Sequence, residues 1–205
     1  MTYDPRKHHR RSIRLKGYDY TQAGAYFVTL VTHDRACLFG EIVDGEMRLN
    51  AYGEIVRDEW FRTAIVRSHV ILDPDEFVVM PNHVHGIIWI VGAGASPAVG
   101  AQRRCAPTGT ADTAITTPTQ HPVRGATPAN VIPGSLGAIV RAIKSATTKR
   151  INALRGTPAA PVWQRDYYEH IIRDQTSLHR IREYIMANPQ KWSLDRENPE
   201  RPAPG

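Results

Sequence analysis

The sequence has little cysteine and no long apolar segment. Two cysteines, Cys37 and Cys105, in 205 residues do not make a disulfide framework. No apolar run approaches the roughly 20 residues that a membrane-spanning helix needs. The chain is charged from Arg6 onward and lacks the apolar core of a secretory signal near its start. We therefore expect a reducing, cytoplasmic location and no membrane partner.

Acidic residues are also under-represented. Twenty Asp and Glu face 26 Lys and Arg, which gives a net charge of +6 with nine histidines counted as neutral. A basic protein favours a polyanionic partner, and nucleic acid ranks before a membrane surface. Apolar residues make up 41% of the chain, so a single globular domain over residues 1–205 is expected.

Three segments differ in composition from the rest of the chain. Residues 92–132 are rich in Gly, Ala, Pro and Thr, and we expect a flexible insertion in a surface loop. Residues 1–22 form a basic N-terminal arm whose cations alternate with apolar and aromatic groups. The arm fits either a solvated tail or a phosphate-binding segment. Residues 194–205 form a polar tail that we expect to be frayed.

The remaining sequence predicts an ordered series of strands and helices. Strands are expected at 25–33, 70–80, 83–90 and within 162–172, a hairpin around Asp44-Gly45, and helices at 51–66, 135–154 and 176–187. Strands segregated from helices indicate an α+β fold. The order matches a ferredoxin-like (RRM-like) central antiparallel sheet with helices packed on one face, which would leave the other face free for a nucleic-acid strand.

Two histidines stand out in the stretch FVVMPNHVHGIIWI, residues 77–90. Side chains alternate along a strand, so His83 and His85 lie on the same face. They could be a satisfied core pair, or they could present two nitrogens to one metal ion. The expected last helix contains Tyr184 and, four residues later, Asn188, which share one face. Taken alone, these two residues fit ordinary packing and helix termination.

Taken together, these blocks resemble a known family. RRSIRLKGYDY, GAYFVTL, PNHVHG, GSLGAIVRAIKS and VWQRDYYEHIIRD through EYIMANPQKW resemble, in order, the single-tyrosine transposases of the HUH endonuclease superfamily, and within them the REP-associated tyrosine transposases. The similarity covers nearly all of the chain outside 92–132 and the tail. It implies a DNA strand transferase that acts on single-stranded or hairpin DNA of the repetitive extragenic palindrome type, in a bacterial, nucleoid-associated setting.

The resemblance also implies residue roles. Tyr184 would be the nucleophile that forms a 5′-phosphotyrosine, and His83, His85 and Asn188 would bind Mg²⁺ or Mn²⁺. Tyr167 and Tyr168 are competing tyrosines that we interpret as packing or DNA-contacting residues. No nucleotide cofactor is expected, because the sequence has no P-loop. The candidate DNA-binding cations lie in the arm and on the 135–154 helix: Arg10, Arg11, Arg14, Lys16, Arg141, Lys144, Lys149 and Arg150.

The sequence leaves two matters open. A non-catalytic protein that keeps this fold and binds DNA hairpins is the alternative to an enzyme, although the complete set of His, Tyr and Asn argues against it. The oligomeric state is also open. One tyrosine cuts one strand at a time, so two concerted cuts need either a homodimer or two rounds by a monomer.

Overall fold

A computed structural model describes residues 15, 17–92 and 132–201 of the chain. Most of the basic arm, nearly all of the 92–132 insertion and the last four residues of the tail lie outside the described residues. The predictions for Arg10, Arg11, Arg14 and Lys16 fall there as well. Among the described residues, no helix combines the length and the apolar character that crossing a bilayer requires.

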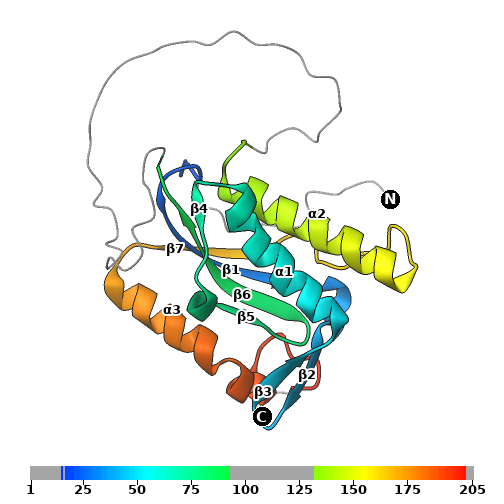
Figure 1. The fold of residues 1–205 in the computed structure, drawn as a ribbon. Coiled ribbons are helices and arrows are strands. Elements are labelled where there is room, and N and C mark those ends of the chain that lie inside the picture. Colours follow the sequence, from blue (N-terminus) through cyan, green and yellow to red (C-terminus); the bar gives the residue numbers. More distant parts are fainter. Residues whose placement is uncertain (1–14, 16, 93–131, 202–205) are drawn as a thin grey trace, which may run out of the picture.

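The described residues form an α+β fold around one antiparallel sheet (Figure 1), as predicted. The sheet has the order β4-β6-β1-β7, and β5 also pairs with β6. Every pairing is antiparallel. The strands are β1 (Gly24–Val31), β4 (Val70–Ile71), β5 (Phe77–Val79), β6 (His83–Ile90) and β7 (Tyr168–Ile172). A separate hairpin joins β2 (Gly40–Val43) to β3 (Glu46–Leu49).

The three long helices begin where the sequence supplies a side-chain cap. They are α1 (Ala51–Val66), α2 (Leu136–Arg155) and α3 (Gln175–Ala187). Asn50, Ser135 and Asp174 each accept a hydrogen bond from a backbone N–H in the first turn of the helix that follows. Gly156 ends α2 in the left-handed region, with φ of 65°.

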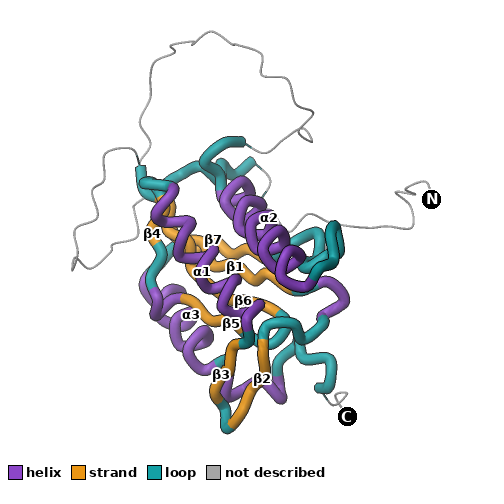
Figure 2. Tube along the Cα trace, turned by 45° about the vertical axis from the view of Figure 1, so that its right-hand side comes forward, coloured by secondary structure: helices purple, strands orange, loops and turns teal. Residues whose placement is uncertain are grey.

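Helices α1 and α2 lie together over one face of the sheet (Figure 2). Their apolar residues, including Trp60, Ile139 and Ile143, pack on the face formed by Tyr26, Val28 and the even-numbered residues of β6. This layer is the main core of the protein, and burial of its apolar surface is the dominant stabilising contribution.

Helix α3 lies on the opposite face, which we had expected to be free. Leu178 and Ile185 pack against Phe27, Ile87 and Trp89 in a second, smaller core. The prediction of helices on one face therefore holds for α1 and α2 but not for α3. The physical reason is that β1 and β6 are apolar on both faces, so each face needs a covering layer.

Two expected strands are shorter or interrupted. The 70–80 segment divides into β4 and β5, because Pro74 begins the short 3-10 helix η2 (Pro74–Glu76) between them. In the 162–172 segment only β7 is a strand, although Trp163 forms an isolated bridge to Thr32. Two further 3-10 helices, η1 (His33–Arg35) and η3 (Pro189–Leu194), flank the sheet.

Gly86 is the position in β6 where a side chain does not fit. A Cβ there would lie 2.4 Å from the Trp60 ring, which stacks on Phe77 with ring centroids 4.5 Å apart. We expect Gly86→Ala to lower the free energy of unfolding by about 1–3 kcal/mol, the usual cost of overpacking a core. Thermal or denaturant unfolding measures this change. Gly92→Ala is the matched control, because a Cβ at Gly92 meets nothing within 4 Å. Equal stability of the two variants would contradict the argument.

Candidate active site

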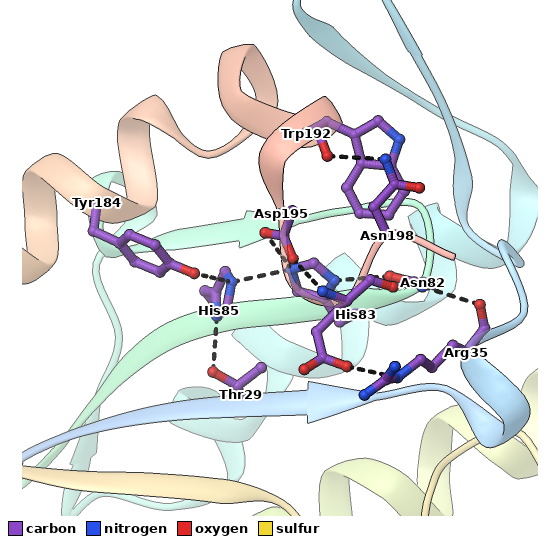
Figure 3. Close-up of polar contacts among 10 residues, drawn as sticks. Thr29, Arg35, Asn82, His83, His85, Tyr184, Trp192, Asp195 and Asn198 are labelled. Atoms are coloured by element: carbon purple, nitrogen blue, oxygen red, sulfur yellow. Dashed lines mark hydrogen bonds and ion pairs between the residues drawn. The ribbon is translucent and has the colours of Figure 1, made fainter. Parts of the chain in front are cut away.

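His83 and His85 point from β6 to the face that α3 covers (Figure 3). Both imidazoles are buried, with exposed fractions of 0% and 3%. Their Nε2 atoms lie 3.0 Å apart. The prediction that the two side chains share a face is confirmed, and the two nitrogens converge on one point. Burial lowers the pKa of His83 to about 4 and also lowers the pKa of His85, so both imidazoles are neutral at pH 7 and keep their lone pairs.

Asn82 fixes the tautomer of His83. Its amide nitrogen donates to the carbonyl oxygens of Arg35 and Glu197, at 2.9 and 2.7 Å. The amide oxygen of Asn82 therefore faces His83 Nδ1, 2.8 Å away, and accepts a hydrogen bond from its N–H. His83 Nε2 is then left with a lone pair that points into the site. Asn82 comes directly before the first histidine, and the sequence analysis gave it no role of its own.

His85 has a partner that permits either tautomer. Its Nδ1 lies 2.8 Å from the hydroxyl of Thr29 on β1, which can donate or accept. When the hydroxyl accepts from Nδ1–H, His85 Nε2 presents a second lone pair beside that of His83. Thr29 stands opposite His85 in the β1–β6 register, so strand pairing supplies this contact.

Asp195 is a site residue that sequence analysis missed. Its carboxylate lies 3.8 Å from His83 Nε2, and the ligand atoms of His83, His85 and Asp195 all lie within 4.8 Å of one another. Glu197 is held by Asn82 and by an ion pair with Arg35 at 3.0 Å. The expectation of a frayed tail is therefore wrong for residues 195–201. No local pattern marks Asp195, because it reaches the site through contacts distant in sequence.

Tyr184 reaches the site from α3. Its hydroxyl lies 3.2 Å from His85 Nε2, and its ring meets the Phe27 ring edge-on, with centroids 6.1 Å apart. The side chain remains 46% exposed, so a large substrate can approach it. Burial raises the pKa of Tyr184, and the negative charge of Asp195 raises it further, while a hydrogen bond with Asn188 opposes the change. A positive charge beside the hydroxyl would favour the phenolate.

Asn188 caps the C-terminus of α3, one turn beyond Tyr184. It is 3% exposed, and its side-chain oxygen is buried without a hydrogen-bond partner. An unsatisfied buried acceptor costs free energy unless a ligand meets it. The side-chain oxygen of Asn188 is therefore available to bind a cation, one helical turn from Tyr184.

The donor set fits a divalent cation. Two neutral imidazole nitrogens and a carboxylate oxygen converge, and an unpartnered amide oxygen lies on the same helix as Tyr184. Imidazole and oxygen ligands are those that divalent metals use in open catalytic sites. Four protein thiolates or imidazoles, the closed set of structural zinc, are absent from this group.

Helix α3 is held in place by a buried ion pair. Arg182, two residues before Tyr184, donates to the Glu76 carboxylate, at 2.9 Å from its Nε. The second oxygen of that carboxylate accepts from the Trp89 indole at 2.6 Å. Glu76 is only 2% exposed. The two contacts join α3 to η2 and β6, and so help to hold Tyr184 in position relative to the histidines.

The predicted cations of α2 lie on the other side of the sheet from Tyr184. The Lys144 ammonium donates to the backbone oxygens of Gln164 and Asp166, and burial lowers its pKa to about 8. Arg150 pairs with Glu59 and Asp58 of α1. These two contacts are structural. Arg141 and Lys149 are exposed, and no ion pair to either occurs within the described residues. DNA binding by the four residues stays a prediction.

The competing tyrosines lie away from the metal-ligand group. Tyr167 packs against the main core, and Lys144 lies over its ring at 5.6 Å from the centroid. Tyr168 is half exposed on β7, and its ring meets that of Phe27 at 6.2 Å. Of the three candidate nucleophiles, Tyr184 is the one whose hydroxyl touches a histidine of the site.

The role of Asn82 can be measured by metal affinity. Asn82→Ala removes the acceptor that orients His83, and we expect divalent-cation binding to weaken about 10- to 100-fold, as for other partners of metal-binding histidines. Isothermal titration with Mn²⁺ measures this. Asn82→Asp keeps an acceptor for His83 and should retain more affinity than Asn82→Ala, although it loses the two hydrogen bonds that the amide nitrogen donates and should be less stable than the wild type. Unchanged affinity in a folded Asn82→Ala protein would show that Asn82 does not orient the ligand.

One of two similar solved structures shares this fold. A REP-associated tyrosine transposase bound to a REP hairpin aligns over 90% of this chain and 77% of its own, with a TM-score of 0.53 and 17% identity. At that identity the similarity establishes the antiparallel sheet with packed helices and nothing finer. A candidate transposase from Deinococcus radiodurans aligns over 85% of this chain and 96% of its own, at 18% identity, with a TM-score of 0.37, which is too low to bear on the fold.

Sequence comparison adds one protein. No protein-family model matches the chain. An uncharacterized protein of Haemophilus influenzae is 39% identical over 194 residues, which cover 94% of this chain and 95% of that protein. At this identity and coverage, the chain belongs to the same family as the Haemophilus influenzae protein.

Proposed function

We propose that the protein is a metal-dependent single-stranded DNA endonuclease and strand transferase that uses Tyr184 as its nucleophile. The observation that carries the proposal is the contact between the Tyr184 hydroxyl and His85 Nε2, inside a group of converging metal-ligand atoms. A hydroxyl beside side chains that can hold a divalent cation suits tyrosine attack on a phosphodiester, because the cation would offset the negative charge of the phosphate. The fold shared with a hairpin-bound transposase supports DNA as the partner.

The side chains of the site have two roles, metal binding and the orientation of other side chains. His83, His85 and Asn188 would hold Mg²⁺ or Mn²⁺, with Asp195 as a further oxygen ligand. The bound cation would offset the charge of the phosphate and favour the Tyr184 phenolate. Asn82 and Thr29 orient the two imidazoles, and Phe27 fixes the ring of Tyr184 from the side.

The chemistry is a transesterification. The Tyr184 hydroxyl gives up its proton and its oxygen attacks the phosphorus. The bond from phosphorus to the 3′ oxygen breaks, and that oxygen takes up a proton to become a free 3′-hydroxyl. The product is a 5′-phosphotyrosine that keeps the energy of the broken ester. Reversal onto another 3′-hydroxyl therefore needs no nucleotide cofactor.

The substrate that we propose is DNA with a hairpin of the repetitive extragenic palindrome type. The basic arm, with Arg10, Arg11, Arg14 and Lys16, and the exposed cations Arg141 and Lys149 are the candidate phosphate contacts. Because α2 and Tyr184 lie on opposite faces of the sheet, a ligand that touches both must wrap around an edge. A folded hairpin with a single-stranded extension could contact α2 with one part and Tyr184 with the other.

The test is a covalent-adduct assay. The protein is incubated with a hairpin oligonucleotide copied from the flanks of its own gene, with Mn²⁺ or Mg²⁺, and is then run on a denaturing gel. We expect a protein–DNA adduct that disappears with EDTA. Hairpin binding without any adduct, in every divalent metal tried, would instead make the protein a non-catalytic hairpin-binding protein.

A further inference from the structure

An open pocket lies between β1, β7 and the first turns of α3, one helical turn before Tyr184 on α3. Its volume is about 370 Å³, within the usual range of small-ligand pockets. Its lining includes Phe27, Tyr168, His170, Ser177, Arg180 and Ile181. We propose that this cavity, here called the β7–α3 pocket, binds the base of a nucleotide adjacent to the scissile phosphate. The inference rests on the proposed function and names a subsite for it.

Strand register places the pocket next to the metal-ligand group. Thr29 of β1 pairs with His85 on one side and with Tyr168 on the other. The three side chains share the face that α3 covers, and two strand spacings of roughly 4.8 Å put Tyr168 about 10 Å from His85. A phosphate held at His85 and Tyr184 would therefore have its neighbouring nucleotide within reach of the pocket.

Phe27 forms a wall that the site and the pocket share. Its ring stacks on His85 with centroids 5.5 Å apart and planes at 23°. The same ring meets Tyr184 and Tyr168 edge-on, at 6.1 and 6.2 Å. Contacts between rings therefore connect Tyr184, through the buried ring of Phe27, to Tyr168, which is 50% exposed. An exposed aromatic ring at the end of such a surface is a platform on which a base can stack.

The polar groups of the pocket suit a neutral base better than a phosphate. The Arg180 guanidinium is exposed, and no ion pair to it occurs within the described residues, so it can stack on a base or bond to its edge. Ser177 and His170, with Oγ and Nε2 3.5 Å apart, offer donors and acceptors to a base edge. The Asp174 carboxylate also lines the pocket, where it accepts from the Ser177 N–H, and its negative charge disfavours a phosphate there.

The test couples a change in the DNA to a change in the protein. The cleavage position is first mapped with the wild-type protein on its flanking hairpin repeat, and an abasic nucleotide is then placed on either side of the scissile phosphate. Single-turnover adduct formation is measured for wild type, Tyr168→Leu and Tyr168→Phe. At one of the two positions we expect the abasic DNA to slow the wild type about 10- to 100-fold, the size of a lost base-stacking contact.

The protein variants decide the interpretation. Tyr168→Leu should slow cleavage of intact DNA by a similar factor and should lose no more with the abasic DNA, because the stacking partner is already gone. Tyr168→Phe keeps the ring and should behave as wild type. Independent, multiplicative losses from Tyr168→Leu and the abasic nucleotide, or no loss at either abasic position, would overturn the pocket assignment.

A binding measurement separates this inference from the proposed function. 2-Aminopurine replaces the flanking base, and its fluorescence is followed with Tyr184→Phe, which cannot form the adduct. Quenching that is lost in Tyr168→Leu/Tyr184→Phe supports the pocket even if the wild type never cleaves. An adduct in the wild type together with unquenched 2-aminopurine at both positions would retain the enzyme and reject the pocket.

Discussion

Tyr184→Phe is expected to form no detectable covalent adduct while it binds hairpin DNA as tightly as the wild type. The change removes the attacking oxygen and keeps the ring that packs on Phe27 and His85. It deletes the hydrogen bonds of the hydroxyl with His85 and Asn188, so the free energy of unfolding should change by only about 1–3 kcal/mol. A denaturing gel measures the adduct, and fluorescence anisotropy measures hairpin binding.

The neighbouring tyrosines supply the controls. Tyr167→Phe and Tyr168→Phe should both form the adduct, because neither hydroxyl is placed against the histidines. If the adduct persisted in Tyr184→Phe and vanished in one of these two variants, the nucleophile would be that tyrosine and our assignment would be wrong. Peptide mapping of the wild-type adduct gives the same answer without any substitution.

The second large effect is expected from His83→Ala and His85→Ala. Each variant removes one of two converging Nε2 atoms, so divalent-cation affinity should fall by more than the roughly 100-fold that marks the loss of a partner of a metal-binding histidine. Adduct formation should be lost with it. Calorimetric titration with Mn²⁺ measures the affinity directly, and EDTA should reproduce the loss of adduct in the wild type, reversibly on adding Mn²⁺.

His179→Ala is the matched control, because His179 is an exposed histidine of α3 that pairs with Glu183 at 3.2 Å. It should leave metal affinity and adduct formation unchanged. Asp195→Asn and Asn188→Ala then ask which oxygens complete the site, since each removes one candidate ligand. Wild-type metal affinity in both His83→Ala and His85→Ala would reduce the two histidines to a buried core pair.

Much of the candidate site follows from short-range periodicity. Alternation along a strand puts His83 and His85 on one face whatever the rest of the chain does. The helical repeat puts Tyr184 and Asn188 one turn apart in the same way. The need for glycine at position 86 cannot be predicted from periodicity, because its sequence neighbours do not show that Trp60 lies against it. Its reason for being glycine is a packing contact between α1 and β6.

The sequence by itself therefore determined the basic charge, the α+β class and the order of the elements. Its resemblance to the single-tyrosine transposases predicted the four residues of the expected site. Tertiary structure alone decided which segments meet. It brought Asp195 to the histidines, joined the backbone of Glu197 to Asn82 and so gave Asn82 its orienting role, and placed α3 over the sheet face that we had expected to be free. These contacts join residues far apart in the chain. They form because both faces of β1 and β6 must be covered, and because a buried polar side chain such as that of Asn82 is stable only with hydrogen-bond partners.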